Sequence, residues 1–162
     1  MRSKRYAAAT LAAATLGLAA AAYHADARDA QGHDPIARGR YLVKIAGCND
    51  CHTPGYGSSG GKVPEDRWLT GDRVGWNGPW GTTYPANLRL ALNGMSEDHW
   101  VHLAKTAKYR PPMPWFALHD MSEQDLRDIH RYVRSLGPAG EPAPAYLPPE
   151  AKPSGPVIAF PR

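Results

Sequence analysis

The residues best suited to chemistry are two cysteines and a histidine that follow one another in the run Cys48-Asn49-Asp50-Cys51-His52. Both cysteines of the chain lie in this run. The spacing C-x-x-C-H is the attachment signature of a c-type haem. Two thiols three positions apart can each bond to a vinyl group of one porphyrin, and the adjacent imidazole can then bind the iron. We therefore predict one covalently bound haem c, attached through Cys48 and Cys51, with His52 as an iron ligand.

Three other interpretations of this run explain fewer of its residues or lack the context that they require. A structural disulfide between Cys48 and Cys51 would close only a two-residue loop and would leave His52 without a role. A thioredoxin-like redox pair requires a βαβ context, and no alternating strand pattern is visible. A zinc site needs four ligands, and no second C-x-x-C or paired histidines complete one.

A second iron ligand is expected on the far side of the haem, because electron-transfer cytochromes usually close the iron with Met or His. Met95 and Met121 each precede a serine that is a candidate helix N-cap, so both are explained as hydrophobic staples. Met113 lies between prolines in Arg110-Pro111-Pro112-Met113-Pro114-Trp115, where regular helix is excluded. We predict an extended, stiff segment that presents the Met113 sulfur to the iron; a methionine filling a gap in the core is the competing interpretation.

Histidines are the rival ligands to Met113. Each lies on or beside a predicted helix among polar neighbours, where a solvated histidine is the common case, and His119 is the nearest to Met113 in sequence. The set comprises His99, His102, His119 and His130.

Three helices are predicted to position these residues. Asp34-Pro35 reads as an N-cap followed by a proline at the first helical position, and this helix extends to about residue 46 and leads into Cys48. Residues 97–108 and 122–136 form the other two, each behind a serine cap. Gly39 is costly in the first helix, so a close crossing by the last helix near Ile129 or Tyr132 is its expected explanation.

The segment between residues 55 and 87 is dense in Gly, Pro and Trp and shows no clear period. A long irregular segment in a compact domain normally wraps around something, and here that is the haem. Simple loop packing is an equal alternative for each residue. Expected pocket walls are Trp76, Trp80 and Tyr84, and expected hydrogen-bond partners of the haem propionates are Arg73, Trp80 and Asn87.

The first 27 residues have the order of a secretory signal. A positive start precedes an alanine-rich apolar run over residues 7–22, and Ala25-Asp26-Ala27 offers a small-x-small cleavage site. The run is shorter than the roughly 20 residues that span a bilayer. We therefore expect cleavage near Ala27 and a periplasmic protein, with a haem domain over residues 28–137 and an extended, proline-rich tail over residues 138–162. Whether this tail lies on the domain or docks on a partner is open.

The charge balance excludes a nucleic-acid partner. The full chain has 19 Lys+Arg and 15 Asp+Glu; without Arg2, Lys4, Arg5 and Asp26 of the signal segment it has 16 and 14, a formal charge of +2. No cluster of five or six basic residues is present, as nucleic-acid binding would favour. No further stretch is long and apolar enough for a membrane span in the mature chain.

The chain resembles the class I cytochrome c family through Gly39-Arg40-Tyr41-Leu42 before the haem motif, Pro112-Met113-Pro114, and the closing helix. The stretch over residues 78–88, GPWGTTYPANL, is similar to the cytochrome subunits of membrane-associated alcohol and aldehyde dehydrogenases. The resemblance covers roughly residues 36–137. It implies an all-α class I cytochrome c fold, His52 and Met113 as axial ligands, and electron transfer between redox partner proteins. Those dehydrogenase subunits typically hold several haem domains, whereas this chain has one C-x-x-C-H.

The expected function is therefore that of an electron carrier with one haem, without catalysis of its own. The partners would be a dehydrogenase, an oxidase or another cytochrome, with the chain either free or a subunit of a complex. The alternative is a periplasmic oxidoreductase or peroxidase, which would require Met113 to leave the iron and His99, His102 or His119 to act as the distal acid-base group. A haem-based sensor ranks last, because no output domain is attached.

Overall fold

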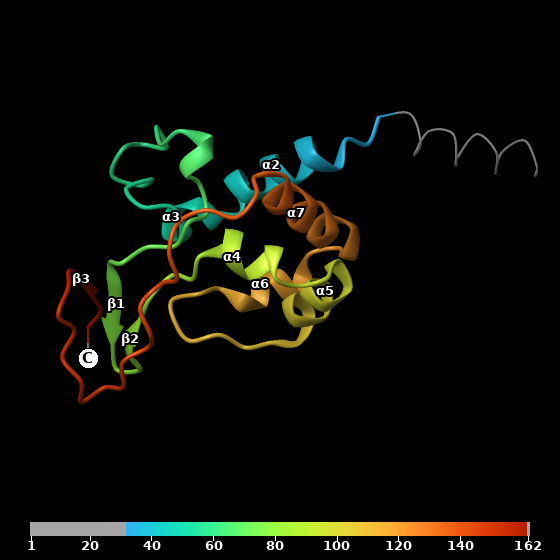
Figure 1. Cartoon of the computed structure of the whole chain (residues 1–162). Helices are drawn as coiled ribbons and strands as arrows, with labels where there is room; N and C mark the ends of the chain where they lie inside the picture. Colours follow the sequence, from blue (N-terminus) through green and yellow to red (C-terminus); the bar gives the residue numbers. More distant parts are fainter. Residues whose placement is uncertain (1–31, 162) are drawn as a thin grey trace, which may run out of the picture. The chain divides into compact units, whose positions relative to one another are not determined.

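The computed structural model describes residues 32–161, and from Pro35 onward this part of the chain forms one compact unit (Figure 1). The expected signal segment, residues 1–27, lies outside the described residues. The elements, in chain order, are α2 (Pro35–Ile45), α3 (Cys48–His52), the 3-10 helix η1 (Glu65–Arg67), β1 (Gly75–Gly78), β2 (Gly81–Thr83), α4 (Leu88–Asn93), α5 (Glu97–Thr106), α6 (Trp115–Asp120), α7 (Glu123–Ser135) and β3 (Val157–Ala159).

The first and last helices of the described residues, α2 and α7, pack closely against each other (Figure 1). A Cβ atom on Gly39 would lie 2.1 Å from the carbonyl oxygen of Asp128 and 2.7 Å from the Cβ of Tyr132. Glycine at this position therefore permits the backbones to approach, and the predicted crossing near Tyr132 is confirmed. Leu42 and Val43 of α2 are buried against the apolar face of α7. This crossing fixes the direction in which α2 leads into the haem motif.

Serine caps begin two of the helices, as the sequence predicts. The Ser96 hydroxyl accepts a hydrogen bond from the His99 amide at 3.3 Å, and the Ser122 hydroxyl accepts one from the Asp125 amide at 3.1 Å. Each serine hydroxyl thus satisfies an amide that has no partner within its own helix. Met95 and Met121, which precede the caps, are partly buried against the hydrophobic core. The staple interpretation of both methionines fits this packing.

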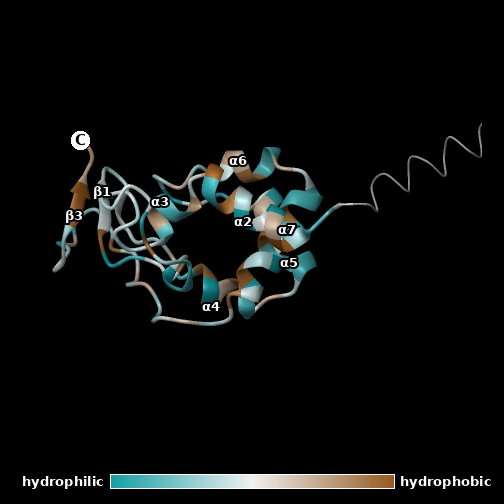
Figure 2. Cartoon of the chain, turned by 90° about the horizontal axis from the view of Figure 1, so that it is seen from above, coloured by the Kyte–Doolittle hydropathy of each residue, from teal (hydrophilic) through white to brown (hydrophobic). Residues whose placement is uncertain are grey.

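A small three-stranded sheet departs from the all-α expectation. β1 and β2 form an antiparallel hairpin in which Gly78 pairs with Gly81, and β3 adds to the other side of β1 in parallel. In the view of Figure 2 the sheet lies at one end of the described chain, α3 is the helix nearest to it, and α4 and α6 are well separated. The described fold is therefore mostly helical with a sheet beside the haem motif. The sheet was not foreseen because its strands are only three or four residues long.

The proline-rich tail folds back on the rest of the chain. It passes the N-terminal end of α4, where Asn87 donates to the carbonyls of Ala139 and Glu141, and it contributes β3 at the sheet (Figure 1). Leu147 forms an isolated antiparallel bridge with Thr82. The Phe160 amide donates to the carbonyl of Asn77 at 2.7 Å. For the described residues, the tail therefore lies on its own domain; whether it also docks on a partner stays an open question. Among residues 32–161, no helix has the length and apolar character that a bilayer span requires.

Candidate haem site

The two cysteines and the histidine share one short helix, α3, directly after α2. Gly47, between the two helices, has φ +71°, a left-handed conformation that turns the chain sharply. Cys48 and Cys51 are three residues apart on α3, so their side chains lie on the same side of the helix. His52 is the last residue of α3. The fold therefore presents two thiols and one imidazole from a single helical turn.

Both thiols are free and half-buried. Burial raises the pKa of Cys48 to about 11, and burial also raises the pKa of Cys51. Redox-active cysteine pairs depend on a lowered thiol pKa that produces the nucleophilic thiolate. Neutral thiols beside a histidine do not fit a thioredoxin-like site. Within residues 32–161 all three strands follow α3, so no strand precedes the motif as a thioredoxin-like βαβ unit requires.

The imidazole of His52 is held in one orientation by the backbone of a distant segment. Its Nδ1 lies 2.7 Å from the carbonyl oxygen of Ala86. A carbonyl only accepts hydrogen bonds, so Nδ1 carries the proton and Nε2 keeps its lone pair. Burial lowers the pKa of His52, against the opposing effect of the Ala86 carbonyl. A neutral ring with Nε2 free is the form that binds a metal, and a carbonyl on the other nitrogen is its usual support.

The end of α3 is locked by a buried hydrogen-bond relay. The Thr53 hydroxyl donates to Oδ1 of Asn49 at 2.7 Å and accepts from the Leu69 amide at 2.7 Å. The carbonyl of His52 accepts from the Gly71 amide at 2.8 Å. Asn49 and Thr53 are almost fully buried. These bonds hold the backbone of His52 from both sides, so the ring has little freedom to leave its position.

The donor set fits a haem better than a bare metal ion. Within the described residues no group of three or more His, Cys, Asp or Glu side chains is placed to hold a metal, so the zinc interpretation lacks its ligands. Two neutral thiols and one oriented imidazole from a single turn match what covalent attachment and one axial bond require.

The family model for cytochrome c matches residues 36–137. The chain belongs to the cytochrome c family. Its cofactor is accordingly a covalently bound haem c, for which Cys48, Cys51 and His52 form the attachment motif. Comparisons with curated proteins and with solved structures find no match. The expected similarity to dehydrogenase subunits therefore stays a prediction.

In this cytochrome c, Met113 lies on a separate segment just before α6. The prolines do exclude helix, but residues 111 and 112 form a turn instead of the fully extended segment expected. The Met113 amide donates to the carbonyl of Arg110 at 3.3 Å, and the Met113 carbonyl accepts from the Trp115 amide at 2.9 Å. The side chain is half-buried and packs against the hydrophobic core. Ligation of the iron by Met113 stays a prediction.

The rival histidines have different surroundings. His99 and His102 are exposed on α5, as expected of solvated residues. His130 is only 3% exposed, and its Nε2 lies 3.2 Å from the carbonyl of Met95, so the expectation of a solvated side chain is wrong there. His119 is half-buried, with Nε2 3.0 Å from the carbonyl of Ala107 and its ring against Trp115. The partners of both rings, the carbonyls of Ala107 and Met95, are distant in sequence, so the polar neighbours of these histidines do not reveal them.

The three residues expected at the propionates have different surroundings, and their role there stays a prediction. Asn87 caps α4 by accepting from the Leu90 amide at 3.1 Å, and its amide nitrogen donates to the carbonyls of Ala139 and Glu141 in the tail. Its side chain is thus already occupied by the fold. Arg73 is exposed and borders a cavity of about 360 Å³, which is lined on its other side by tail residues 140–143. Trp80 lies at the turn of the hairpin, and its buried indole N–H has no partner among the described residues.

Trp80 is therefore the candidate whose hydrogen bond is still unmade. Buried indole N–H groups usually have an acceptor, and a propionate would supply one. Trp80 and Trp76 both pack against Phe160 of the tail, with ring centroids 5.2 and 5.8 Å apart from it. The predicted pocket walls thus contact the tail.

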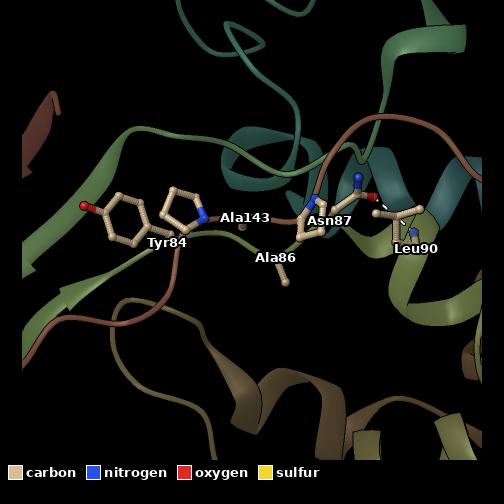
Figure 3. A pocket seen from close by; sticks show the side chains of 7 residues that line it. Tyr84, Ala86, Asn87, Leu90 and Ala143 are labelled. Atoms are coloured by element: carbon tan, nitrogen blue, oxygen red, sulfur yellow. Dashed lines mark hydrogen bonds between the residues drawn. The ribbon is translucent and has the colours of Figure 1, made fainter.

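The tail also lies beside the segment that contains Ala86, whose carbonyl orients His52. A cavity of about 300 Å³ lies between residues 84–90 and the tail residues 142–144 (Figure 3). Tyr84, Ala86, Asn87 and Leu90 line one wall, and Pro142, Ala143 and Pro144 line the other.

The sequence marks the haem-attachment motif but not the residues that support it. Ala86 acts through its carbonyl, which every residue possesses, so no signal in the sequence marks it. Arg89 is 5% exposed and donates to the carbonyls of Asp66 and Gly137 at 2.6 Å each, and also to that of Leu136. A basic residue within the apolar run of α4 was the available signal for this buried role.

Proposed function

We propose that this cytochrome c is a periplasmic carrier of single electrons, with a low-spin haem iron bound by His52 and Met113. The observation that carries the proposal is the hydrogen bond from Nδ1 of His52 to the Ala86 carbonyl, because it leaves Nε2 available in a fixed direction. Family membership supports a haem-binding electron carrier. The presence of a methionine in a proline-bounded turn supports the sixth ligand.

The residues of the chain have simple roles in this proposal. When bound, the haem supplies a one-electron iron couple. Cys48 and Cys51 hold it covalently, and His52 provides a ligand whose orientation does not change because α3 is locked by Thr53 and Gly71. The Met113 thioether would occupy the remaining axial position and exclude water, which favours the reduced state and raises the potential. With both positions filled, little has to rearrange when an electron is transferred.

The redox partners would be other electron-transfer proteins, such as a dehydrogenase, an oxidase or another cytochrome. Export is supported by the signal-like order of residues 1–27. Expression in a host with haem maturation tests this point: we expect a haem-staining protein in the periplasmic fraction whose N-terminus is Arg28. Recovery in the cytoplasm with Met1 retained would contradict export.

The ligand assignment is tested by Met113→Ala. Removal of the thioether should open the iron, so we expect a lower reduction potential, loss of the far-red absorption that sulfur ligation produces in ferric haem, and rapid binding of carbon monoxide by the reduced protein. Met95→Ala is the matched control, because Met95 is also half-buried against the core. An optical spectrum unchanged in Met113→Ala, or changed equally in the control, contradicts ligation by Met113. Rapid binding of carbon monoxide or cyanide by the unmodified protein would favour the enzymatic alternative.

A further inference from the structure

The segment before Met113 is in direct contact with the tail. The guanidinium carbon of Arg110 lies 3.8 Å from the centre of the Tyr146 ring, within the range of a cation–π interaction. Arg110 is also the residue whose carbonyl accepts the Met113 amide. A contact made by Arg110 therefore acts within one turn of Met113.

Tyr146 is held in place by contacts that do not involve Arg110. Its hydroxyl donates to the carbonyl of Trp80 at 2.9 Å. Its neighbour Leu147 exchanges two backbone hydrogen bonds with Thr82, at 2.8 and 3.0 Å. The hairpin leaves room for this bridge, because Gly81 has φ +97° and a Cβ atom there would lie 2.2 Å from the Leu147 carbonyl oxygen. The ring of Tyr146 is thus a fixed surface built by β2 and the tail.

The segment that receives this support has few restraints of its own. Among the described residues, the backbone of residues 108–112 makes one hydrogen bond, the one between Arg110 and Met113. The Arg110 side chain makes no ion pair within residues 32–161 and no other aromatic contact there. Lys108 lies over the Trp115 ring of α6 at 5.5 Å, and within the described residues the Arg110–Tyr146 stack is the contact that joins this segment to the tail and the sheet.

We infer that Tyr146 is a positioning residue for the Met113 segment, acting through the stacked Arg110 guanidinium. The inference rests on the proposed ligation by Met113. The tail would hold the segment so that the thioether stays on the iron. Loss of the ring would then increase the fraction of protein in which Met113 has left the iron, without removing any group that binds the haem.

The experiment measures the affinity of the ferric protein for imidazole, a small ligand that binds only when the sixth position is open. With a cation–π contact of ordinary strength, Tyr146→Ala should bind imidazole about three- to tenfold more tightly. Tyr146→Phe keeps the ring and should change the affinity less than about twofold. Arg110→Gln removes the cation from an exposed position and should reproduce the Ala result. The double variant Tyr146→Ala with Arg110→Gln should show no further gain, because both changes remove one interaction.

Tyr41→Ala is the control, since Tyr41 also lies beside a guanidinium, that of Arg38 at 5.7 Å, but belongs to α2 and not to the Met113 segment or the tail. Equal imidazole affinity in Tyr146→Ala, Arg110→Gln and the control overturns the inference. If the unmodified protein lacks the far-red signature of sulfur ligation, the proposed function fails instead, and the two failures are thereby distinguished. A reduction potential lowered in both variants but not in Tyr41→Ala supports positioning over a merely structural role.

Discussion

Replacement of Gly39 by alanine tests the crossing of α2 and α7 on which the position of the haem motif depends. The added Cβ would lie 2.1 Å from the Asp128 carbonyl oxygen, whereas such contacts are essentially never shorter than 3.0 Å. The two helices would have to separate by about 0.9 Å at this point. The obstacle is the backbone of a 13-residue helix, so no side-chain rotation can relieve it.

The expected loss of stability follows from two opposing effects. Alanine is better than glycine in a helix by about 1 kcal/mol. Overpacking of a tight core costs about 1–3 kcal/mol and occasionally more, and a clash with backbone belongs at or above the upper end of that range. We therefore expect a net decrease of about 2 kcal/mol in the free energy of unfolding.

Denaturant unfolding of the haem-bound protein, followed by far-UV circular dichroism, measures this difference. Gly94→Ala serves as the control, because Gly94 has φ −85° and a Cβ atom there would approach nothing closer than 3.4 Å. The control should stay within about 0.5 kcal/mol of the unmodified protein. If Gly39→Ala were as stable as Gly94→Ala, the geometry assigned to the crossing would be wrong.

Two further predictions concern the supports of the helices. Arg89→Met should lower the free energy of unfolding by about 3 kcal/mol, because two backbone carbonyls at the end of α7 and the Asp66 carbonyl in η1 lose a charged donor. Arg89→Lys should lose less, and equal losses in chemical denaturation would refute this account. The second concerns Glu97, whose pKa is lowered by Arg131 and Arg127. A carboxyl with a lowered pKa stabilises the fold above its unfolded pKa and loses that effect as the pH falls, so the stability difference between the unmodified protein and Glu97→Gln should be largest near neutral pH and shrink below about pH 4.5. A difference that stays constant from neutral to acidic pH would contradict the role of these ion pairs.

Features with local causes could be predicted from the sequence. The serine caps act within one turn of their helices, and the helices over residues 35–45, 97–106 and 123–135 begin and end within two residues of the expected boundaries. The haem motif occupies five consecutive residues. Gly39 was recognised because glycine is unfavourable inside a helix unless a close neighbour requires it.

Features that depend on pairing between distant segments could not be predicted from the sequence. α3, α4 and α6 are five or six residues long, too short for a helical period to appear in the sequence. β1 pairs with a strand that begins about 80 residues later, across most of the domain. The tail has a composition that favours extended chain, and the same extended chain serves as a strand once Thr82 and Asn77 offer backbone partners.

The orientation of His52 shows how such distant pairing reaches the site itself. The ring depends on a carbonyl 34 residues away, and that carbonyl is brought near by a second glycine. Gly71 has φ +79°, and a Cβ atom there would lie 2.8 Å from the Asn87 amide nitrogen and 3.0 Å from the Pro85 carbonyl oxygen. Gly71 also donates its amide to the His52 carbonyl. Because only glycine allows these two segments to meet beside α3, the conformation at Gly71 controls the imidazole more directly than the side chain of Ala86 does.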